Sequence, residues 1–278
     1  MQDAFAYCSE LVRAADGDRF IAALFAPAER RGALHALYAF NGEVSRVRDV
    51  AREALPGEIR LQWWSEVVSG ERNEEAHANP VAAALLTTME RHHLATTLLA
   101  DLIEAHRFDL YDEPMTDIAA LEAYATKTSS ALFALAAQVV GEGEIEPVAG
   151  PAGIAHAIAG MLRAFPVHAA RGRLYVPAAL LDRHQVHPRD IFAGRSSAGL
   201  RAALAELGNL ARHNLIAVQK RITALPPAAI PVLLPLALVR PSLDRLERGD
   251  PFAPAEIPPW RRQWLIWRAA RNPARIAS

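Results

Sequence analysis

The sequence contains a single cysteine, Cys8. An internal disulfide is therefore excluded, and a reducing compartment is expected. Its 30 lysines and arginines nearly balance its 31 aspartates and glutamates, which leaves a net charge of −1. Without an excess of positive charge, the protein as a whole does not attract nucleic acid. Disorder is excluded by composition, because 51% of the residues are hydrophobic and only 22% are charged. These absences leave a globular protein with no predicted nucleic-acid partner.

The sequence also lacks a clear targeting or membrane-spanning segment. Its first residues show no basic region followed by an apolar stretch, which argues against a signal peptide. The most apolar segment, residues 224–239, contains four prolines and is shorter than the roughly 20 residues that a spanning helix needs. We therefore expect a buried helix with broken ends. A cytoplasmic protein is predicted, with peripheral contact at the inner face of the membrane left open.

Helical periodicity dominates the chain. In residues 31–50, Leu34, Leu37, Val44 and Val47 recur at spacings typical of one face of a long helix. The same pattern predicts helices over residues 58–68, 80–93, 96–110, 118–140, 153–169, 197–222 and 259–270. No convincing alternating strand competes with them. We therefore expect one all-α domain over residues 1–278, folded as a helical bundle.

Several segments carry a specific resemblance to a known family. Residues 31–40 read RGALHALYAF, residues 41–49 read NGEVSRVRD, and residues 161–177 read MLRAFPVHAARGRLYVP. Shorter matches lie between them, at residues 79–81, 108–110 and 121–124. In order and spacing they resemble the squalene/phytoene synthases, in which an ALYAF helix ends in an Asp-rich motif and an LRDxxxD helix runs into RGRxYLP. The resemblance covers nearly the whole chain.

The resemblance implies an isoprenoid synthase fold with a central cavity. In active members of the family, two facing helices hold carboxylates that bind Mg²⁺, and the metal grips the diphosphate of a prenyl substrate. The chemistry explains these residue types, because Mg²⁺ prefers oxygen ligands and acids three or four residues apart share one helix face. The metal neutralises the leaving diphosphate while a carbocation forms in a dry cavity.

Most of those carboxylates are missing from this sequence. The first motif has Ser45, Arg46 and Asp49 where the family has three aspartates, and the second has Ala164 and His168 where it has two. An arginine at a metal position replaces an attraction by a repulsion of roughly 4 kcal/mol per pair of unit charges at about 4 Å. These five positions are therefore interpreted as degenerate, with no catalytic residue and no metal cofactor expected. His168 is interpreted as an interior histidine.

Two groups of acidic residues are candidate replacement ligands. Asp49 and Glu53 are four residues apart, and Asp109, Asp112 and Glu113 follow a predicted helix. We interpret both groups as solvated acidic faces. The family's Ser-x-Ser-Phe segment, where the diphosphate is expected to rest, is also changed here, to DGDRF at residues 16–20.

The functional side chains that remain in the motifs are basic and aromatic. Arginine binds phosphate bidentately without a metal, so these side chains could form a pocket for an anion, a lipid or a prenyl ligand. Alternatively, the arginines that follow the second motif cap a helix C-terminus and pair with surface carboxylates. The sequence leaves both interpretations open for Tyr38, Arg46, Arg163, Arg171, Arg173 and Tyr175.

A stripe of tryptophan and arginine marks the predicted helix at residues 259–270. Trp260, Trp264 and Trp267 repeat at i, i+4 and i+7, interleaved with Arg261, Arg262, Arg268 and Arg271. Such a helix either docks at an anionic membrane surface or on a partner, or packs its tryptophans into the bundle and leaves the arginines in water. Periodicity does not decide between these alternatives.

Within the resembling family, this sequence is similar to a branch with eroded Asp motifs that assists assembly of mitochondrial respiratory complex I. The segment GEIRLQWW at residues 57–64 is of that type. The resemblance implies a catalytically degenerate protein with complex I subunits as partners. The alternative is an active, Mg²⁺-dependent isoprenyl transferase that uses farnesyl or geranylgeranyl diphosphate. A lipid-binding module without an assembly role is a third hypothesis.

Overall fold

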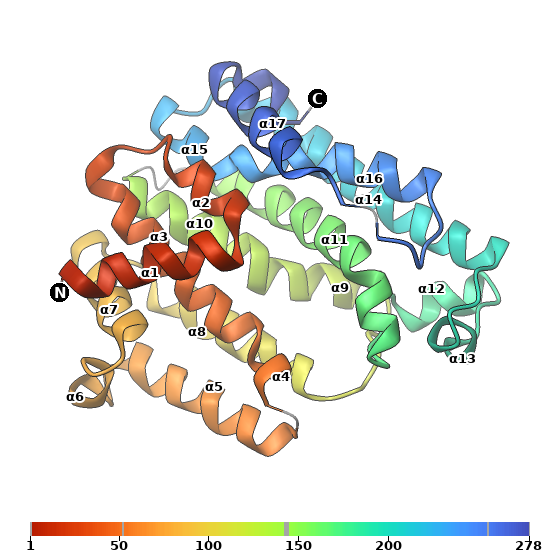
Figure 1. Ribbon diagram of the computed structural model, residues 1–278, viewed down its shortest axis with the longest axis horizontal. Helices are drawn as coiled ribbons and strands as arrows, with labels where there is room; N and C mark the ends of the chain where they lie inside the picture. The colour runs from red at the N-terminus through yellow and green to blue at the C-terminus, as the bar shows by residue number, and fades with distance from the viewer. Residues whose placement is uncertain (1, 52, 142–144, 255, 278) are drawn as a thin grey trace.

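The computed structural model describes residues 2–51, 53–141, 145–254 and 256–277. These residues form helices joined by short connections, and no strand occurs among them (Figure 1). The predicted all-α class is therefore confirmed. The α-helices are α1 Gln2–Ala15, α2 Gly17–Ala23, α3 Ala28–Ser45, α4 Val47–Val50, α5 Ala54–Ser69, α6 Asn73–Ala76, α7 Pro80–His92, α8 Thr96–Ala105, α9 Ile118–Ala125, α10 Ala131–Val140, α11 Glu146–Ala170, α12 Ala178–Arg183, α13 Pro188–Phe192, α14 Ala198–Ile222, α15 Ile230–Leu233, α16 Val239–Arg248 and α17 Pro259–Arg271. Short 3₁₀ or π segments are η1 His106–Leu110, η2 Thr126–Ser130, η4 Pro227–Ala229, η5 Leu234–Leu238 and η6 Pro273–Arg275.

Local sequence signals fix several of these helix ends. Asn79 caps α7, because its side-chain oxygen accepts hydrogen bonds from the backbone N–H groups of Val81 and Ala82 at 2.9 and 3.1 Å. Pro80 occupies the first turn, where its missing N–H costs nothing. At the C-terminus of α5, Gly70 has a φ of 86°. Glycine adopts this left-handed conformation without a steric penalty.

The structure corrects three predicted boundaries. The predicted helix at residues 31–50 is interrupted at Arg46, whose ψ of 11° leaves the helical region and separates α3 from α4. The predicted helix at residues 118–140 contains the π segment η2, a type of irregularity common at functional sites. The helix predicted to begin at residue 153 begins earlier, at Glu146, because Pro147 lies in the first turn, where proline is tolerated.

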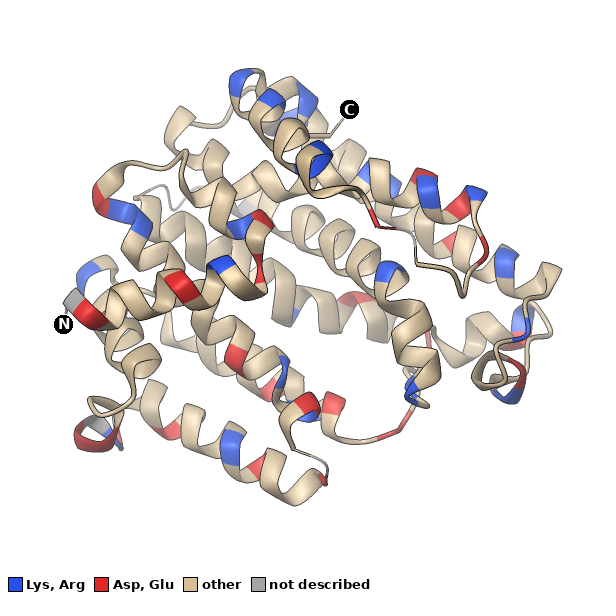
Figure 2. Ribbon diagram, in the orientation of Figure 1, with Lys and Arg blue, Asp and Glu red and all other residues tan. Residues whose placement is uncertain are grey.

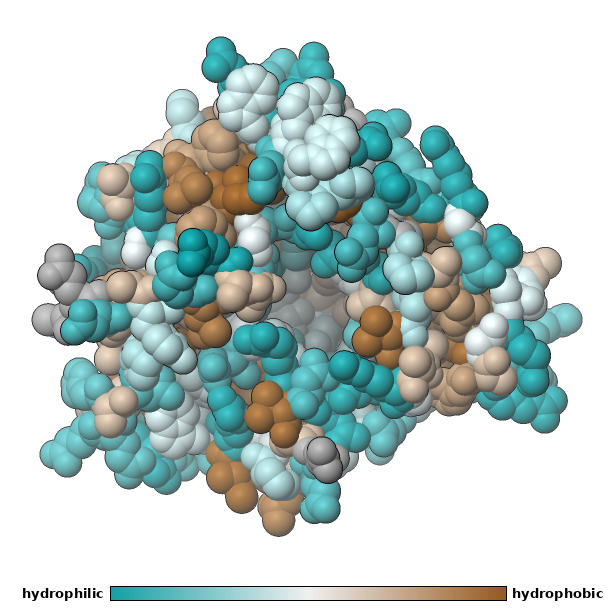
Figure 3. Space-filling view, in the orientation of Figure 1, coloured by the Kyte–Doolittle hydropathy of each residue, from teal (hydrophilic) through white to brown (hydrophobic). Residues whose placement is uncertain are grey.

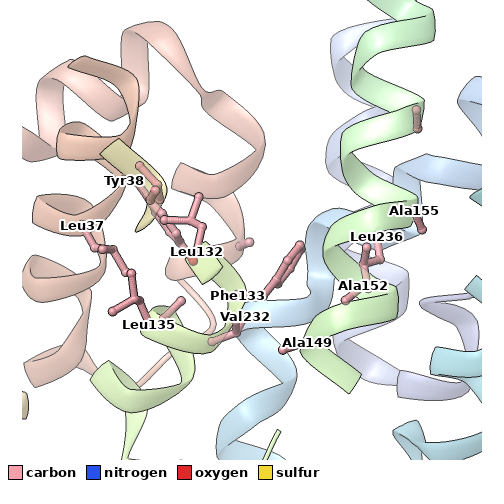
Figure 4. Close-up of a cluster of buried hydrophobic side chains, with 14 of the residues drawn as sticks. Leu37, Tyr38, Leu132, Phe133, Leu135, Ala149, Ala152, Ala155, Val232 and Leu236 are labelled. Carbon is pink, nitrogen blue, oxygen red and sulfur yellow. The ribbon is translucent and has the colours of Figure 1, made fainter. Parts of the chain in front are cut away.

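The core lies between the N-terminal helices and the pair α11 and α14. Figure 4 shows Leu37 and Tyr38 of α3 facing Leu132 and Leu135 of α10 in one part of this core. α11 contributes small side chains there, which let its backbone approach its neighbours closely. At Gly153 an added Cβ would lie 2.2 Å from the backbone nitrogen of Ser130 in η2. These contacts set the position of α11, the helix that carries the second family motif.

Two stretches, Pro147–Ala170 and Pro227–Arg248, have the length and hydropathy of membrane-spanning helices. In the second, 72% of the most apolar window is buried inside the protein. That stretch is also divided into η4, α15, η5 and α16, so the expected buried segment with broken ends is confirmed. Its burial is typical of a core element.

Candidate functional site

A cavity of about 370 Å³ opens where the turn between α1 and α2 meets α11, α16 and the start of α17. The face seen in Figure 3 is hollowed at its centre, between the N-terminal helices and α11. Five charged residues line the cavity, and with His156 neutral their three arginines exceed their two aspartates by one positive charge. The cavity is therefore suited to an anion. The charged residues are Asp16, Asp18, Arg19, Arg163 and Arg262.

The turn between α1 and α2 places two carboxylates in this cavity. Asp16 caps α2, accepting hydrogen bonds from the backbone N–H of Arg19 at 3.1 Å and from its Nη1 at 2.7 Å. Burial alone would raise the pKa of Asp16, but the charge and hydrogen bonds of Arg19 outweigh burial and lower it. Asp18 accepts two hydrogen bonds from Arg262, including one from Nε at 2.9 Å. Both aspartates are therefore already paired with arginines.

His156 and Arg163 of α11 form the opposite wall. Burial, reinforced by the charge of Arg19, lowers the pKa of His156 to about 3, so its imidazole is neutral at physiological pH. Desolvation by the surrounding protein atoms, followed by the charge of Arg262, also lowers the pKa of Arg163, whose side chain remains accessible to solvent. Within the described part of the chain, no carboxylate forms an ion pair with Arg163. Arg163 is thus the cation of this cavity that is available to a bound anion.

A second charged cluster lies at the ends of α4 and α11. Asp49, the one acid left in the first family motif, accepts hydrogen bonds from Nη1 of Arg171 at 2.8 Å and Nη1 of Arg173 at 2.9 Å. Arg173 also donates to the backbone carbonyl of Arg48 at 3.3 Å. Arg48 in turn pairs with Asp112. Two guanidinium groups therefore share Oδ1 of Asp49 and neutralise the charge of its carboxylate.

Asp109 lies behind this cluster and is 8% exposed, so the interpretation of this residue as part of a solvated acidic face is wrong. Its carboxylate accepts hydrogen bonds from Tyr124 at 2.9 Å and Tyr175 at 2.9 Å, and lies 2.7 Å from Nδ1 of His106. Burial, together with the charge of Asp109, raises the pKa of both tyrosines, which therefore stay protonated and donate. Hydrogen-bonding partners make this buried charge stable.

The remaining members of the second motif lie beside these groups. The ring of His168 is 4.7 Å from that of Tyr175, and burial followed by the charge of Arg173 lowers the pKa of His168. Its partial burial fits an interior histidine. Ala164, one turn earlier on α11, is also partly buried and offers no ligand atom.

The structure divides the predicted anion-binding residues between two places. Tyr38 and Arg46 line a smaller cavity of about 140 Å³ that shares Asp16 and Arg19 with the larger cavity, which Arg163 lines. The guanidinium of Arg19 lies 5.6 Å from the ring of Tyr38, and burial raises the pKa of that tyrosine to about 12. Nε of Arg46 donates to the carbonyl of Gly42, and Ser45 borders the same smaller cavity. Arg171, Arg173 and Tyr175 instead hold Asp49 and Asp109.

Sequence reasoning missed part of the cavity lining. Residues 16–20 form a changed motif and Arg262 belongs to the stripe at residues 259–270, but neither signal connects the two segments, and His156 carries no signal of its own. Arg262 meets Asp18 across 244 residues of chain. A pairing at that separation is created only by folding.

The side chains around Asp49 do not form a binding site for a divalent cation. Across the described ranges, no group of three or more His, Cys, Asp or Glu side chains is arranged to hold a metal ion. Mg²⁺ binds through carboxylates and phosphates, and Asp49 is already engaged by two arginines.

The tryptophans of α17 are exposed, so the interpretation that they pack into the bundle is wrong. Trp260, Trp264 and Trp267 are 70%, 46% and 48% exposed. The helix instead buries Leu265 and Ile266, together with Ala269.

Comparison with known proteins identifies relatives of this chain. The family model for squalene/phytoene synthase matches residues 12–268. The human "NADH dehydrogenase (ubiquinone) complex I, assembly factor 6" is 28% identical over 88% of this chain and 74% of its own length. A 15-cis-phytoene synthase of Synechococcus elongatus is 24% identical over 94% of this chain and 91% of its own. Among solved structures, a dehydrosqualene synthase in complex with a ligand superposes with a TM-score of 0.83 at 15% identity, covering 97% of this chain and 96% of its own. The isoprenoid synthase fold is thereby confirmed.

Proposed function

The chain belongs to the squalene/phytoene synthase family, and from its altered family motifs we propose that it assists assembly of respiratory complex I without transferring prenyl groups. Its similarity to complex I assembly factor 6 supports this role, because it extends over 88% of the chain. The phytoene synthase relative is less similar, at 24% identity. Complex I subunits are the partners this role requires.

The observation that carries the proposal is the pairing of Asp49 with Arg171 and Arg173. A metal ion at this position would compete with two guanidinium groups for Asp49 and would gain only one carboxylate. The facing motif offers Ala164 and His168 in place of two further acids. Positive charge close to a dication opposes its binding further. Asp49, Arg171 and Arg173 therefore form an Asp–Arg lock in motifs that hold a metal cluster in active family members.

The larger cavity supports a binding role in place of catalysis. Arg163 supplies a cation there, and Leu238 and Val239 supply an apolar wall. An amphipathic molecule with one anionic group, such as a lipid or a prenyl phosphate, matches this combination. We propose that such a ligand binds in this cavity as part of the assembly function.

Purified protein tests the enzymatic part of the proposal. With farnesyl or geranylgeranyl diphosphate and Mg²⁺, we expect no product above the level of a protein-free control, while an active phytoene synthase in the same buffer gives product. Turnover that depends on Mg²⁺ and disappears in Asp49→Ala would establish the alternative, an active isoprenyl transferase.

Deletion of the gene tests the assembly part. We expect reduced assembled complex I and reduced NADH-dependent respiration, restored by the wild-type chain and also by Asp49→Ala. Restoration by Asp49→Ala separates assembly from metal-dependent chemistry. Normal complex I in the deletion strain would contradict the proposal.

A further inference from the structure

α17 presents two faces of different character. Its inner face packs Leu265, Ile266 and Ala269 into the bundle, and its outer face exposes three tryptophans. At 1.5 Å per residue, the span from Trp260 to Trp267 forms an apolar row of about 10 Å. In Figure 1, α17 lies at the periphery of the molecule, at the top of the view. The exposure of its three tryptophans places this row on the solvent side of the helix.

The charged residues of this helix are all basic. Residues 257–277 contain five arginines and no aspartate or glutamate. Figure 2 shows α17 with basic segments and no acidic ones. One of these arginines, Arg262, is directed inward to Asp18. The others are Arg261, Arg268, Arg271 and Arg275.

Arginine and tryptophan are placed together on this surface. The guanidinium of Arg268 lies 4.6 Å from the ring of Trp264, and that of Arg271 lies 5.3 Å from the ring of Trp267. These cation–π contacts keep the charges at the level of the indole rings. Apolar rings and positive charges at one depth match the interface of a bilayer, where indole rings lie among the headgroups and arginines meet their phosphates.

Neighbouring residues extend the apolar surface beyond α17. Leu24 and Phe25, directly after α2, are 43% and 40% exposed, and α2 packs against α17. Phe25 also borders an apolar groove that continues to Ala270 and Pro273 beside α17. This surface combines a basic helix with exposed apolar groups beside it. All of these groups can therefore contact a lipid bilayer at the same time.

We propose that α17 docks this protein on an anionic lipid bilayer, with the three tryptophans at headgroup depth. The charge complementarity of this acid-free helix selects anionic lipid over neutral lipid. Pro259, Arg262 and Gln263 of the same helix line the large cavity. Docking therefore places a helix that borders the cavity at the lipid surface. The proposal does not depend on the assembly role.

Flotation with protein-free vesicles tests the proposal. We expect the full chain to float with vesicles of phosphatidylcholine and phosphatidylglycerol at low salt, and to remain in solution with vesicles of phosphatidylcholine alone. Tryptophan emission should shift to shorter wavelength only with the anionic vesicles. High salt should weaken binding, because screening reduces the arginine contribution.

Two double variants separate the contributions of the arginine charges and of the tryptophan rings to vesicle binding. Arg261→Gln with Arg271→Gln should weaken binding about 25-fold, at about fivefold per arginine. Trp264→Ser with Trp267→Ser should weaken it on the order of tenfold or more. The matched controls are Lys127→Gln with Arg189→Gln for charge, and Leu55→Ser with Ile59→Ser for exposed apolar groups, all outside α17. Each control should bind as the wild type does.

Other results would overturn the proposal. Equal binding to neutral and anionic vesicles would remove the charge argument, and unchanged binding of the folded tryptophan variant would remove the docking surface. Binding to native membranes that protease treatment of those membranes abolishes, with no binding to pure lipid, would assign the surface to a protein partner.

Discussion

Among the polar residues of the two family motifs and their neighbours, Asp109 should contribute most to the stability of the fold. Asp109→Ala removes a buried carboxylate that contacts Tyr124, Tyr175 and His106 at 2.7 to 2.9 Å. A hydrogen bond to a charged group contributes about 1.5–3 kcal/mol, and removing one partner from a buried charged cluster costs about 3–5 kcal/mol. The two tyrosines are only partly buried, so water replaces some of the lost hydrogen bonds. We therefore expect a loss of about 3–4 kcal/mol in the free energy of unfolding.

Urea denaturation, monitored by circular dichroism, measures this loss. If the variant and the wild type have the same m value, their free energies of unfolding can be compared directly. Asp109→Asn, which keeps the shape but loses one acceptor, should cost about 1–2 kcal/mol. Asp112→Ala is the matched control, because that carboxylate is exposed and makes one pair with Arg48 at 3.3 Å. Its cost should be below about 1 kcal/mol. Equal costs for Asp109→Ala and Asp112→Ala would refute the reasoning.

Two further predictions concern α11. Gly153→Ala should lower the free energy of unfolding by about 2–3 kcal/mol in the same urea assay, because its Cβ would lie 2.2 Å from Ser130. Gly160→Ala, on the same helix with no atom within 4 Å, should be neutral or stabilising by up to about 1 kcal/mol; a similar loss in both variants would contradict the packing argument. His156 has a native pKa of about 3, against 6.5 for the free side chain. The unfolded state therefore binds more protons below pH 6.5, and stability should fall by about 2–3 kcal/mol from pH 7 to 4.5. His156→Gln should show a shallower fall, and an identical pH profile would contradict the assignment.

Local sequence pattern was sufficient for the fold class and the family. Periodic apolar residues predicted most of the helices, because one buried face is a property of each helix alone. The motif segments at residues 31–49 and 161–177 predicted the isoprenoid synthase fold, which the superposition with a dehydrosqualene synthase confirms. The loss of acids at Ser45, Arg46, Ala164 and His168 was also visible in the sequence.

Long-range packing decided which side chains Asp49 and Asp109 contact. Asp49 meets Arg171 and Arg173 across 122 and 124 residues, so no local pattern could distinguish an Asp–Arg lock from an anion pocket. Asp109 looked like part of an acidic surface, because it lies close to two exposed acids in the sequence. Its burial depends on Tyr124 and Tyr175, which reach it from other segments of the chain.

α17 shows the same division most clearly. Its sequence carries apolar residues on two faces, the tryptophans on one side and Leu265, Ile266 and Ala269 on the other. Hydrophobic periodicity predicts a helix from such a sequence but does not choose the face that is buried. The sequence by itself thus determined the helices, the family and the missing carboxylates. Only the tertiary structure decided which charges pair and which apolar face meets solvent, because both depend on surfaces supplied by distant parts of the chain.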